Sequence, residues 1–383
     1  MPDPTPAAVS SPPPTALRIE RGACWVFFAF DVGHGIDLDA AQAALARSRP
    51  TRESLSGDRR TPPSLHFQPT PVQTVEDAAP VRVGRLETAP TVQCTLFDFG
   101  AVTIAFRIPL AGSSLDDLVH LAGEIYESRT LQESARERAR GLLGTLGTAV
   151  NMPGLVDLVE DYVVFHAESW AVDGEPAGAL TSSSLLAFAP SLAAVLRAAD
   201  EPLSDDEIAD AMASRLSYGR SDLTIIDWNA AVVFDARAQD TLTILEFGNV
   251  ELLEMRFLDD RLDAVLDHAY RSVSRRPRLR ANRDERRRLA ALQMDSTLLF
   301  ESINNAVKLV GDQYLARLYR RMARRFHLDE WDESVMRKLE TVQRLYEKLA
   351  DEQSTRRMEL LEWIIILLIA VGLVLPFIPG LAH

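Results

Sequence analysis

The stretch TVQCTLFDFGAVTIAFRIPL, residues 91 to 110, is the clearest fold-determining signal in this chain of 383 residues. It holds two runs rich in β-branched and aromatic residues, separated by the sequence Phe97-Asp-Phe-Gly100. Two such runs around a glycine that can supply a turn are typical of a β-hairpin. We therefore predict two antiparallel strands here, as part of a sheet.

Outward from this hairpin, further strands and capped helices indicate an α+β head domain. The run CWVFFAF at 24–30 predicts a buried strand, and Asp37 predicts the N-cap of the helix that follows. Other strands are predicted at 156–172, 222–234 and 242–247, and other helices after Ser113 or Ser114, at 183–199 and after Ser204. The head domain is predicted over 19–249, after a disordered Pro-rich N-terminus at 1–18 and with a flexible loop at 47–80.

The last third of the chain is helical by its periodicity. Three helical stretches are predicted, at 250–273, at 282–326 and from an N-cap at Asp329. Apolar residues of the third stretch follow a 4-3-4-3 spacing at Val335, Leu339, Val342, Tyr346 and Leu349. That spacing is coiled-coil-like, so we predict a long antiparallel helical hairpin as a stalk over 250–359.

The C-terminal segment WIIILLIAVGLVLPFIPGL, residues 363 to 381, carries no charge. As a helix its nineteen residues would measure about 28 Å, close to the hydrocarbon thickness of a bilayer. It predicts a single C-terminal transmembrane helix at 360–383, which would leave the N-terminal bulk in the cytoplasm; the alternative is a buried or oligomer-forming helix. The residues that define this membrane anchor are Glu362, Trp363, Ile364 and Leu375.

Charge is unevenly distributed along the chain. The total is 41 basic and 55 acidic residues, or −14, yet the segment 271–325 alone carries +10. The acidic total excludes a uniformly basic nucleic-acid coat but not a local basic patch. The patch residues are Arg275, Arg276, Arg278, Arg280, Arg283, Arg286, Arg287, Arg288, Arg320, Arg321, Arg324 and Arg325.

Two interpretations of the basic patch stay open. It is a solvated helix face neutralised by acidic residues of the third helix, or it contacts the phosphates of RNA, the ribosome or anionic lipid head groups. No aromatic residues are interleaved with Arg271–Arg288, which argues against stacking on single-stranded bases.

Motifs for catalysis or cofactor binding are weak. Gly33-His-Gly35 lacks the third glycine and the Lys-Ser/Thr of a phosphate loop, so a plain turn is favoured. The seven histidines show no metal-ligand spacing, and no Gly-x-Ser-x-Gly sequence occurs. Cys24 and Cys94 form no disulfide framework and suit a reducing compartment. We expect no cofactor, no metal and no enzymatic activity.

The segment LEFGNVELLEMRFLDDRLD, residues 245 to 263, resembles the family named for being required for meiotic nuclear division, with its Sad-interacting-factor relatives. This is a domain-of-unknown-function family, and the chain resembles a bacterial-type member. The matching residues are Leu245, Glu246, Asn249, Leu253, Glu254, Arg256, Asp259 and Leu262. Leu361-Glu-Trp-Ile-Ile-Ile366 is similar to the entry of the family's membrane helix, and 97–104 and 31–45 are weaker matches. Gly248, Glu251 and Phe257 depart from the family pattern.

The resemblance implies a membrane-anchored α+β protein that self-associates, with mitochondrial members that support translation. It implies no catalytic residue. The set Glu246, Asn249, Glu254, Arg256 and Asp259 is interpreted as a strand-to-helix corner fixed by charge-assisted hydrogen bonds, with a ligand site as the alternative.

Together these patterns predict a non-enzymatic scaffold or tether, tail-anchored in the lipid bilayer and homo-oligomeric. The alternative is a membrane-associated RNA- or ribosome-contacting module that uses the Arg-rich hairpin. An enzyme with an unrecognised site in the head domain is the third hypothesis.

Overall fold

The computed structural model describes residues 16–48, 69–173, 181–274, 291, 294, 301 and 313–374. By its contacts the chain divides into two compact units. The first unit comprises residues 1–257 and 299–331, and the second comprises residues 258–298 and 332–383. The predicted stalk at 250–359 is thus shared between the two units.

The first unit is built on a mixed sheet of nine strands, in the order β11-β12-β13-β10-β1-β7-β6-β3, with β8 paired to β1. Neighbouring strands are antiparallel except for the parallel pair β10 and β13. The strands are β1 (Leu17–Asp31), β3 (Val72–Asp77), β6 (Thr91–Leu96), β7 (Ala101–Pro109), β8 (Ser113–Ser114), β10 (Glu160–Val172), β11 (Arg215–Leu216), β12 (Leu223–Ile226) and β13 (Ala230–Phe234). Two small ribbons pair β2 (Gly35–Ile36) with β9 (Val150–Asn151) and β4 (Arg82–Val83) with β5 (Leu86–Glu87).

The predicted hairpin at 91–110 is confirmed as β6 and β7. Phe97 N–H donates to the carbonyl of Ala101 over 2.9 Å and closes the turn. Gly100 has φ of +106°, and a Cβ at this position would collide with the carbonyl of Gly33. Glycine is therefore required here both for the backbone angle and for the close approach of the two loops.

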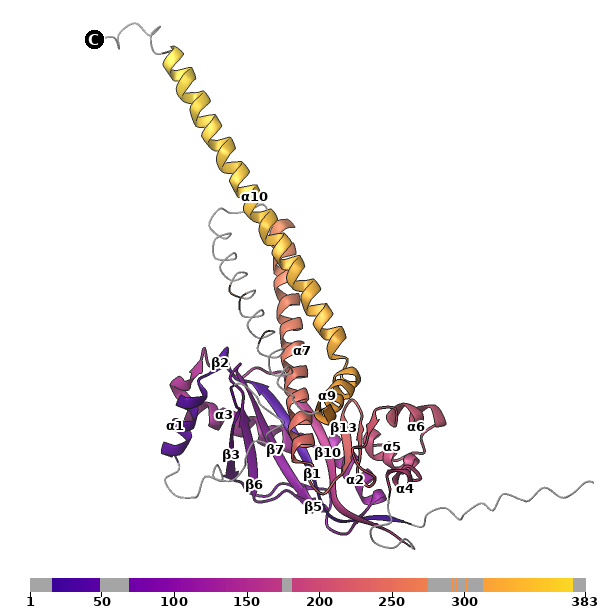
Figure 1. Cartoon of the computed structure of the whole chain (residues 1–383). Helices are drawn as coiled ribbons and strands as arrows, with labels where there is room; N and C mark the ends of the chain where they lie inside the picture. Colours follow the sequence, from indigo (N-terminus) through magenta and orange to yellow (C-terminus); the bar gives the residue numbers. More distant parts are fainter. Residues whose placement is uncertain are drawn as a thin grey trace, which may run out of the picture. The chain divides into compact units, whose positions relative to one another are not determined.

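Helices cover both faces of the sheet (Figure 1). Cys24, Val26 and Phe28 of β1 belong to one core cluster, whereas Phe27 belongs to another, as strand alternation requires. The first cluster includes residues of α1 (Leu38–Ser48), α2 (Leu115–Tyr126), α3 (Arg129–Leu146), α4 (Ser182–Leu186), α5 (Ala189–Arg197) and α6 (Asp205–Ala211). The second includes residues of α7 (Gln239–Ser274) and α9 (Gln313–Arg325).

Several predicted helix starts are confirmed by their caps. Asp37 Oδ1 accepts from Ala40 N–H over 3.0 Å at the start of α1. Ser114 and Asp117 form a capping box on α2, and Ser204 accepts from Glu207 N–H on α6. The single helix predicted at 183–199 is two helices, because α5 begins anew with Pro190 in its first turn.

The strand predicted at 242–247 is wrong, since these residues lie inside the helix α7. Leu242, Leu245, Val250 and Leu253 are all buried. Their spacing is helical and runs without a break through the segment, so the short apolar run LTILEF belongs to a longer helical period.

In the second unit, the end of α7 pairs with the start of α10 (Leu328–Val374). Lys338 Nζ lies 2.8 Å from Asp259 and 2.6 Å from Asp263, and Ser334 Oγ donates to Asp259 over 3.1 Å. The predicted hairpin between the second and third helical stretches depends mostly on residues 282–312, which lie almost wholly outside the described residues. Of the second stretch, residues 313–325 are described as α9, which groups with the sheet.

The prediction of a C-terminal transmembrane helix is wrong. Among the described residues, no helix is long and apolar enough to cross a membrane. Within α10, the uncharged part from Trp363 to Val374 follows Glu362 and rises about 18 Å, short of the roughly 30 Å required. Three further predictions depend on this segment, and they are wrong for the same reason: the single-pass topology, the tail anchor and the membrane location. Leu375 lies outside the described residues.

Candidate functional site

A row of arginines on α9 is the strongest candidate for a functional surface. The buried side of α9 is formed by Leu315, Leu318, Met322 and Ala323, which pack on the sheet. The opposite side carries four exposed arginines, Arg317, Arg320, Arg321 and Arg324. Their spacing of three, one and three residues places them on one helical face, which we call the basic face.

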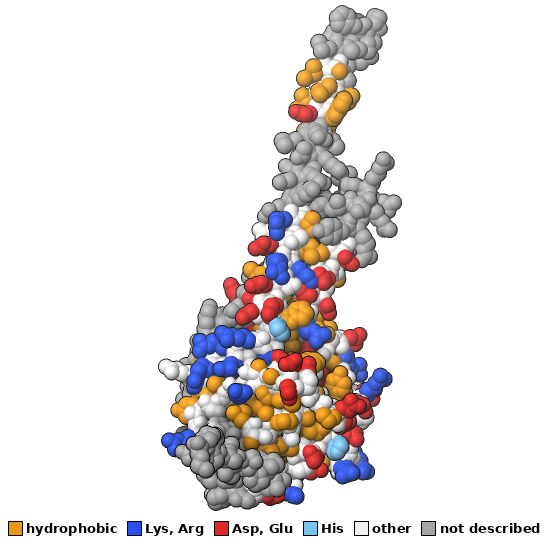
Figure 2. Space-filling view, turned by 90° about the vertical axis from the view of Figure 1, so that its right-hand side faces the viewer, with side chains coloured by type: hydrophobic (Ala, Val, Ile, Leu, Met, Phe, Trp, Pro, Cys, Tyr) orange, Lys and Arg blue, Asp and Glu red, His pale blue; other side chains and the backbone are white. Residues whose placement is uncertain are grey.

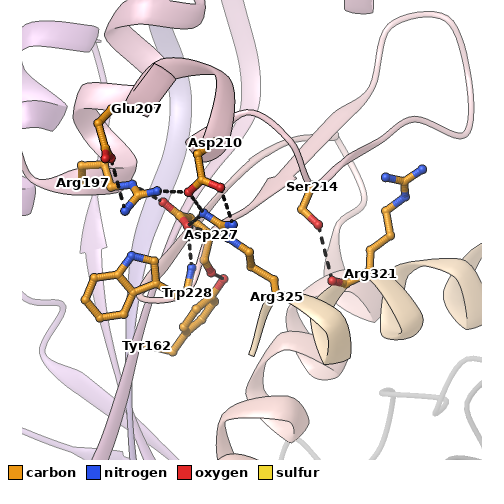
Figure 3. A network of polar contacts seen from close by, with 9 residues as sticks. All are labelled: Tyr162, Arg197, Glu207, Asp210, Ser214, Asp227, Trp228, Arg321 and Arg325. Atoms are coloured by element: carbon orange, nitrogen blue, oxygen red, sulfur yellow. Dashed lines mark hydrogen bonds and ion pairs between the residues drawn. The ribbon is translucent and has the colours of Figure 1, made fainter. Parts of the chain in front are cut away.

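The arginines of the basic face have no carboxylate partner in the part of the chain that the structure describes. Arg321 contributes only its backbone carbonyl, which accepts a hydrogen bond from Ser214 Oγ over 3.4 Å (Figure 3). Figure 2 shows one larger group of basic side chains at an edge of the face in view, with other Lys and Arg side chains scattered over the rest. Four guanidinium groups on one face are therefore open to an anionic partner.

Arg325, one residue further along, has a different role. Its Nε and Nη2 lie 2.8 and 2.5 Å from Asp227 Oδ1, and its Nη2 lies 2.7 Å from Asp210. Arg197 approaches the same two carboxylates, with Nε 2.8 Å from Asp227 and Nη2 2.5 Å from Asp210. We call these four residues the arginine clamp, which Figure 3 shows from close by. The clamp fixes the C-terminal end of α9 on the sheet.

Burial makes the arginine clamp depend on charge matching. Asp227 is fully buried at the end of β12, and two guanidinium groups compensate its charge. Hydrogen bonds from Arg325 lower the pKa of Asp210 to about 2, and in return Asp210 and Asp227 raise the pKa of Arg325. Tyr162 Oη donates to the backbone carbonyl of Asp227 over 2.9 Å, and burial raises the pKa of this tyrosine. The ion pair between Asp210 and Arg325 therefore favours the charged form of both groups.

The second polar cluster contains most of the family-motif residues on α7. Asn249 Nδ2 donates to the backbone carbonyl of Glu160 over 3.2 Å, and Arg256 forms an ion pair with the side chain of Glu160. Glu254 is buried and interacts electrostatically with Asp31 at the end of β1. We call Asp31, Glu160, Asn249, Glu254 and Arg256 the carboxylate corner. It joins β1, β10 and α7.

Negative charge exceeds positive charge in the carboxylate corner. Burial raises the pKa of Glu160 to about 7, despite the opposing attraction of Arg256. Burial and the charge of Asp31 raise the pKa of Glu254 well above its usual range. Gly33 N–H donates to Asp31 Oδ1 over 3.2 Å. In the described ranges, no three His, Cys, Asp or Glu residues are grouped so as to hold a metal ion.

The other sequence-derived site residues are dispersed. Glu246 is buried on α7, while Asp259 belongs to the second unit and pairs with Lys338. Asn249 is not a helix N-cap, because α7 begins ten residues earlier at Gln239. The patch residues Arg275, Arg276, Arg278, Arg280, Arg283, Arg286, Arg287 and Arg288 lie outside the described residues.

Gly248 of α7 lies against Met322 of α9. A Cβ at this position would collide with Sδ and Cε of Met322 on α9. The absence of a side chain at Gly248 leaves room for the flexible end of the Met322 side chain where α7 and α9 meet.

Sequence reasoning missed Asp31, Glu160, Arg197, Asp210 and Asp227. Two of them carried a usable signal, because Asp31 ends the apolar run 24–30 and Asp227 interrupts the apolar segment 223–234. A carboxylate inside a buried strand requires a partner, and that requirement could have marked both residues.

The chain belongs to the family described as "Uncharacterized protein MJ0711, N-terminal domain", whose model matches residues 21–241. It is similar to the protein of that name from Methanocaldococcus jannaschii, with 25% identity over 186 residues. The alignment covers 48% of this chain and 58% of the relative, so the chain spans less than two thirds of the relative's length. No solved structure matches. The expectation of a domain-of-unknown-function family is thus confirmed.

The matched segment ends before α9 and α10. It includes the sheet from β1 to β13 and three residues of the arginine clamp, Arg197, Asp210 and Asp227. The basic face lies beyond it.

Proposed function

We propose that this chain is a non-enzymatic RNA-contacting protein that binds phosphates through the basic face of α9. One observation carries the proposal: four exposed arginines share one helical face and have no carboxylate partner among the described residues. The neighbouring Arg325, by contrast, forms ion pairs with Asp210 and Asp227 in the arginine clamp. Guanidinium groups bind phosphate oxygens in bidentate geometry and stay charged at all physiological pH values.

An RNA partner fits this surface better than an anionic lipid surface. A helix that binds a lipid surface inserts an apolar face between the head groups. The apolar face of α9 is already buried, since Leu315, Leu318 and Met322 pack in the core of the first unit. The helix offers only its charged side, which suits a phosphate backbone.

The carboxylate corner supports the non-enzymatic part of the proposal. Asn249 and Arg256 are directed at Glu160, so these groups join secondary-structure elements. The finer resemblance, to a bacterial-type member of the family required for meiotic nuclear division, belongs to the same proposal. It rests on the segment 245–263, and the support of translation attributed to mitochondrial members is a process that takes place on RNA.

The test is RNA binding by the full chain as a function of salt. A fluorescently labelled RNA is titrated, and the logarithm of the association constant is plotted against the logarithm of salt concentration. Four phosphate contacts predict a slope of about −3 on a single strand. The double variant Arg320→Glu/Arg321→Glu is expected to lower affinity at least tenfold and to reduce the slope by about half.

A matched control keeps the same change of net charge elsewhere. Arg129→Glu/Arg140→Glu alters two exposed arginines of α3, which covers the opposite face of the sheet. This control is expected to change affinity less than about threefold, through long-range charge alone. A slope near zero, or an equal loss in both double variants, would contradict the proposal.

We further propose self-association as a second function, on a separate observation in the second unit. Eight large apolar side chains between Leu361 and Ile369 are exposed, from 44% for Ile364 to 70% for Trp363. A single helix that is apolar on all sides requires other chains to cover it. Light scattering after gel filtration is expected to give a multiple of the chain mass for the wild type and a smaller mass for Ile365→Lys/Leu368→Lys. Met336→Lys, at an isolated exposed apolar residue of α10, is the control. A wild-type mass equal to one chain would contradict self-association.

A further inference from the structure

An exposed tyrosine lies next to the α9 helix although it comes from a distant part of the sequence. Tyr218 belongs to the loop between β11 and β12, and its side chain is 77% exposed. Asp222 Oδ2 accepts from Tyr218 N–H over 2.6 Å, and its Oδ1 accepts from Gly219 N–H. These two hydrogen bonds close the loop, so that the backbone that presents Tyr218 is fixed.

The tyrosine ring is held against α9. Tyr218 and Tyr314 meet edge to face, with ring centroids 5.4 Å apart and an interplanar angle of 73°. Tyr314 is half-buried in the first turn of α9, and Arg317 follows one turn later. Residues three apart on a helix are neighbours, so the aromatic pair stands at the N-terminal end of the basic face.

This arrangement supplies what the sequence around Arg271–Arg288 lacks. Phosphate contacts do not by themselves select a single strand, because a duplex presents phosphates too, at a higher charge density. An exposed aromatic ring with an open side binds the flat face of an unstacked base, which a duplex does not offer. The loop adds a further exposed arginine, Arg220, two residues after the tyrosine.

We propose that the surface formed by Tyr218 and the basic face takes single-stranded RNA, with one base stacked on Tyr218 and the adjoining phosphates bound by Arg317, Arg320, Arg321 and Arg324. The inference rests on the proposed function and specifies the class of RNA. Stacking of the base on Tyr218 and binding of the phosphates by the arginines are separate contributions to the binding free energy. Each can therefore be removed by substitution while the other is kept.

The experiment compares two probes with the full chain at constant salt. One is a labelled oligouridine of about ten nucleotides, longer than the smallest single-strand sites. The other is a blunt RNA duplex of similar length. Tyr218→Ala is expected to weaken oligouridine binding about fivefold to a hundredfold, the range of one stacked base, and to leave the duplex affinity within about twofold. Tyr218→Phe keeps the ring and is expected to retain the wild-type affinity for both probes.

A matched control is Tyr126→Ala, since Tyr126 is equally exposed at 74% but lies at the end of α2. It is expected to change neither affinity. Photocrosslinking of an oligomer that contains 4-thiouridine is expected to label Tyr218, and Tyr218→Ala removes that adduct while the salt slope stays unchanged.

The outcomes separate the two proposals. If oligouridine binding is steeply salt-dependent and sensitive to Arg320→Glu/Arg321→Glu but unchanged by Tyr218→Ala, the single-strand inference is overturned and the proposed function stands. Equal or tighter binding of the duplex also overturns the inference. If neither probe binds with a salt slope, both proposals fail together.

Discussion

The arginine clamp and the carboxylate corner are polar clusters of the first unit that each contain a fully or almost fully buried carboxylate, yet their charge balance differs. The clamp opposes Asp210 and Asp227 with the guanidinium groups of Arg197 and Arg325. In the corner, Arg256 pairs with Glu160, and Asp31 and Glu254 add two further carboxyl groups. Hydrogen bonds from Arg325 therefore lower the pKa of a clamp carboxylate, whereas burial raises the pKa of two corner carboxylates.

The comparison teaches that burial by itself does not decide the state of a carboxylate. Cations that hydrogen-bond to a carboxylate favour its charged form, as the two arginines do at Asp210. A buried carboxylate with too few cations binds a proton more tightly in the folded protein than in the unfolded chain. The folded state therefore loses stability as the pH rises through this range. The first unit thus has one charge-matched attachment, at α9, and one proton-sensitive attachment, at residues 249–256 of α7.

The largest effect on stability is expected from removing Asp227, the buried carboxylate at the centre of the arginine clamp. Asp227→Ala leaves two partly buried guanidinium groups with only the half-exposed Asp210 of the clamp carboxylates, so the free energy of unfolding is expected to fall by about 3–5 kcal/mol. Urea unfolding followed by tryptophan fluorescence measures it. Asp260→Ala, at an exposed carboxylate of α7, is the control and is expected to change stability by less than about 0.5 kcal/mol. A loss below about 1 kcal/mol for Asp227→Ala would show that α9 is attached by its apolar side alone.

The corner is tested by the pH dependence that Glu160 creates. The folded-state pKa of about 7 exceeds the usual 4.5, so folding binds a proton and stability falls as pH rises between these values. From pH 5 to pH 8, the wild type is expected to lose about 2–3 kcal/mol relative to Glu160→Gln, which cannot titrate. Glu137→Gln, at an exposed glutamate of α3, is expected to give no such difference. Parallel pH profiles for wild type and Glu160→Gln would contradict the raised pKa.

A smaller effect is expected from the hydroxyl that supports the clamp. Tyr162→Phe removes the hydrogen bond to the carbonyl of Asp227 and leaves that buried carbonyl without this donor. We expect a loss of about 1 kcal/mol in the free energy of unfolding, measured by urea denaturation. Tyr126→Phe on the surface serves as the control. An unchanged midpoint would mean that the carbonyl is satisfied in another way.

The smallest effect concerns the exposed member of the clamp. The pKa of Asp210 is lowered to about 2, so its pairing with Arg325 contributes above the usual 3.8 and is lost as pH falls towards 2. Because about half of this side chain is exposed, Asp210→Asn is expected to cost less than about 1 kcal/mol at pH 7. A carboxyl NMR titration is expected to place the Asp210 midpoint near 2. A midpoint near 4 would show that the ion pair does not persist in solution.

Local signals predicted much of the first unit. The hairpin of β6 and β7 and the caps Asp37, Ser114 and Ser204 depend on residues close together in the chain, and all are confirmed. The segment 242–247 failed because a six-residue apolar run fits a strand and one side of a buried helix equally well. The prediction of a transmembrane helix failed because the sequence count included all of residues 363–381. The uncharged run within the described part of α10 ends earlier, at Val374.

The candidate site was only partly predictable, since its partners come from distant segments. Sequence placed Asn249, Glu254 and Arg256 in one corner, and the structure adds Asp31 and Glu160 from two strands. Sequence grouped Arg325 with Arg320, Arg321 and Arg324, but Arg325 turns to the buried Asp227. Tyr218 could not be associated with α9, because only the fold brings its loop to Tyr314.

The burial of α9 on the sheet has a consequence for how the chain is made. Phe27 and Val164 share their core cluster with Leu315 and Leu318, which are synthesised nearly three hundred residues after Phe27. At about 5–20 residues per second, translation leaves this cluster incomplete for roughly 15–60 s. One face of the nascent sheet therefore lacks α9 until that helix has been synthesised, so the apolar side chains that α9 covers in the folded chain stay uncovered for that time.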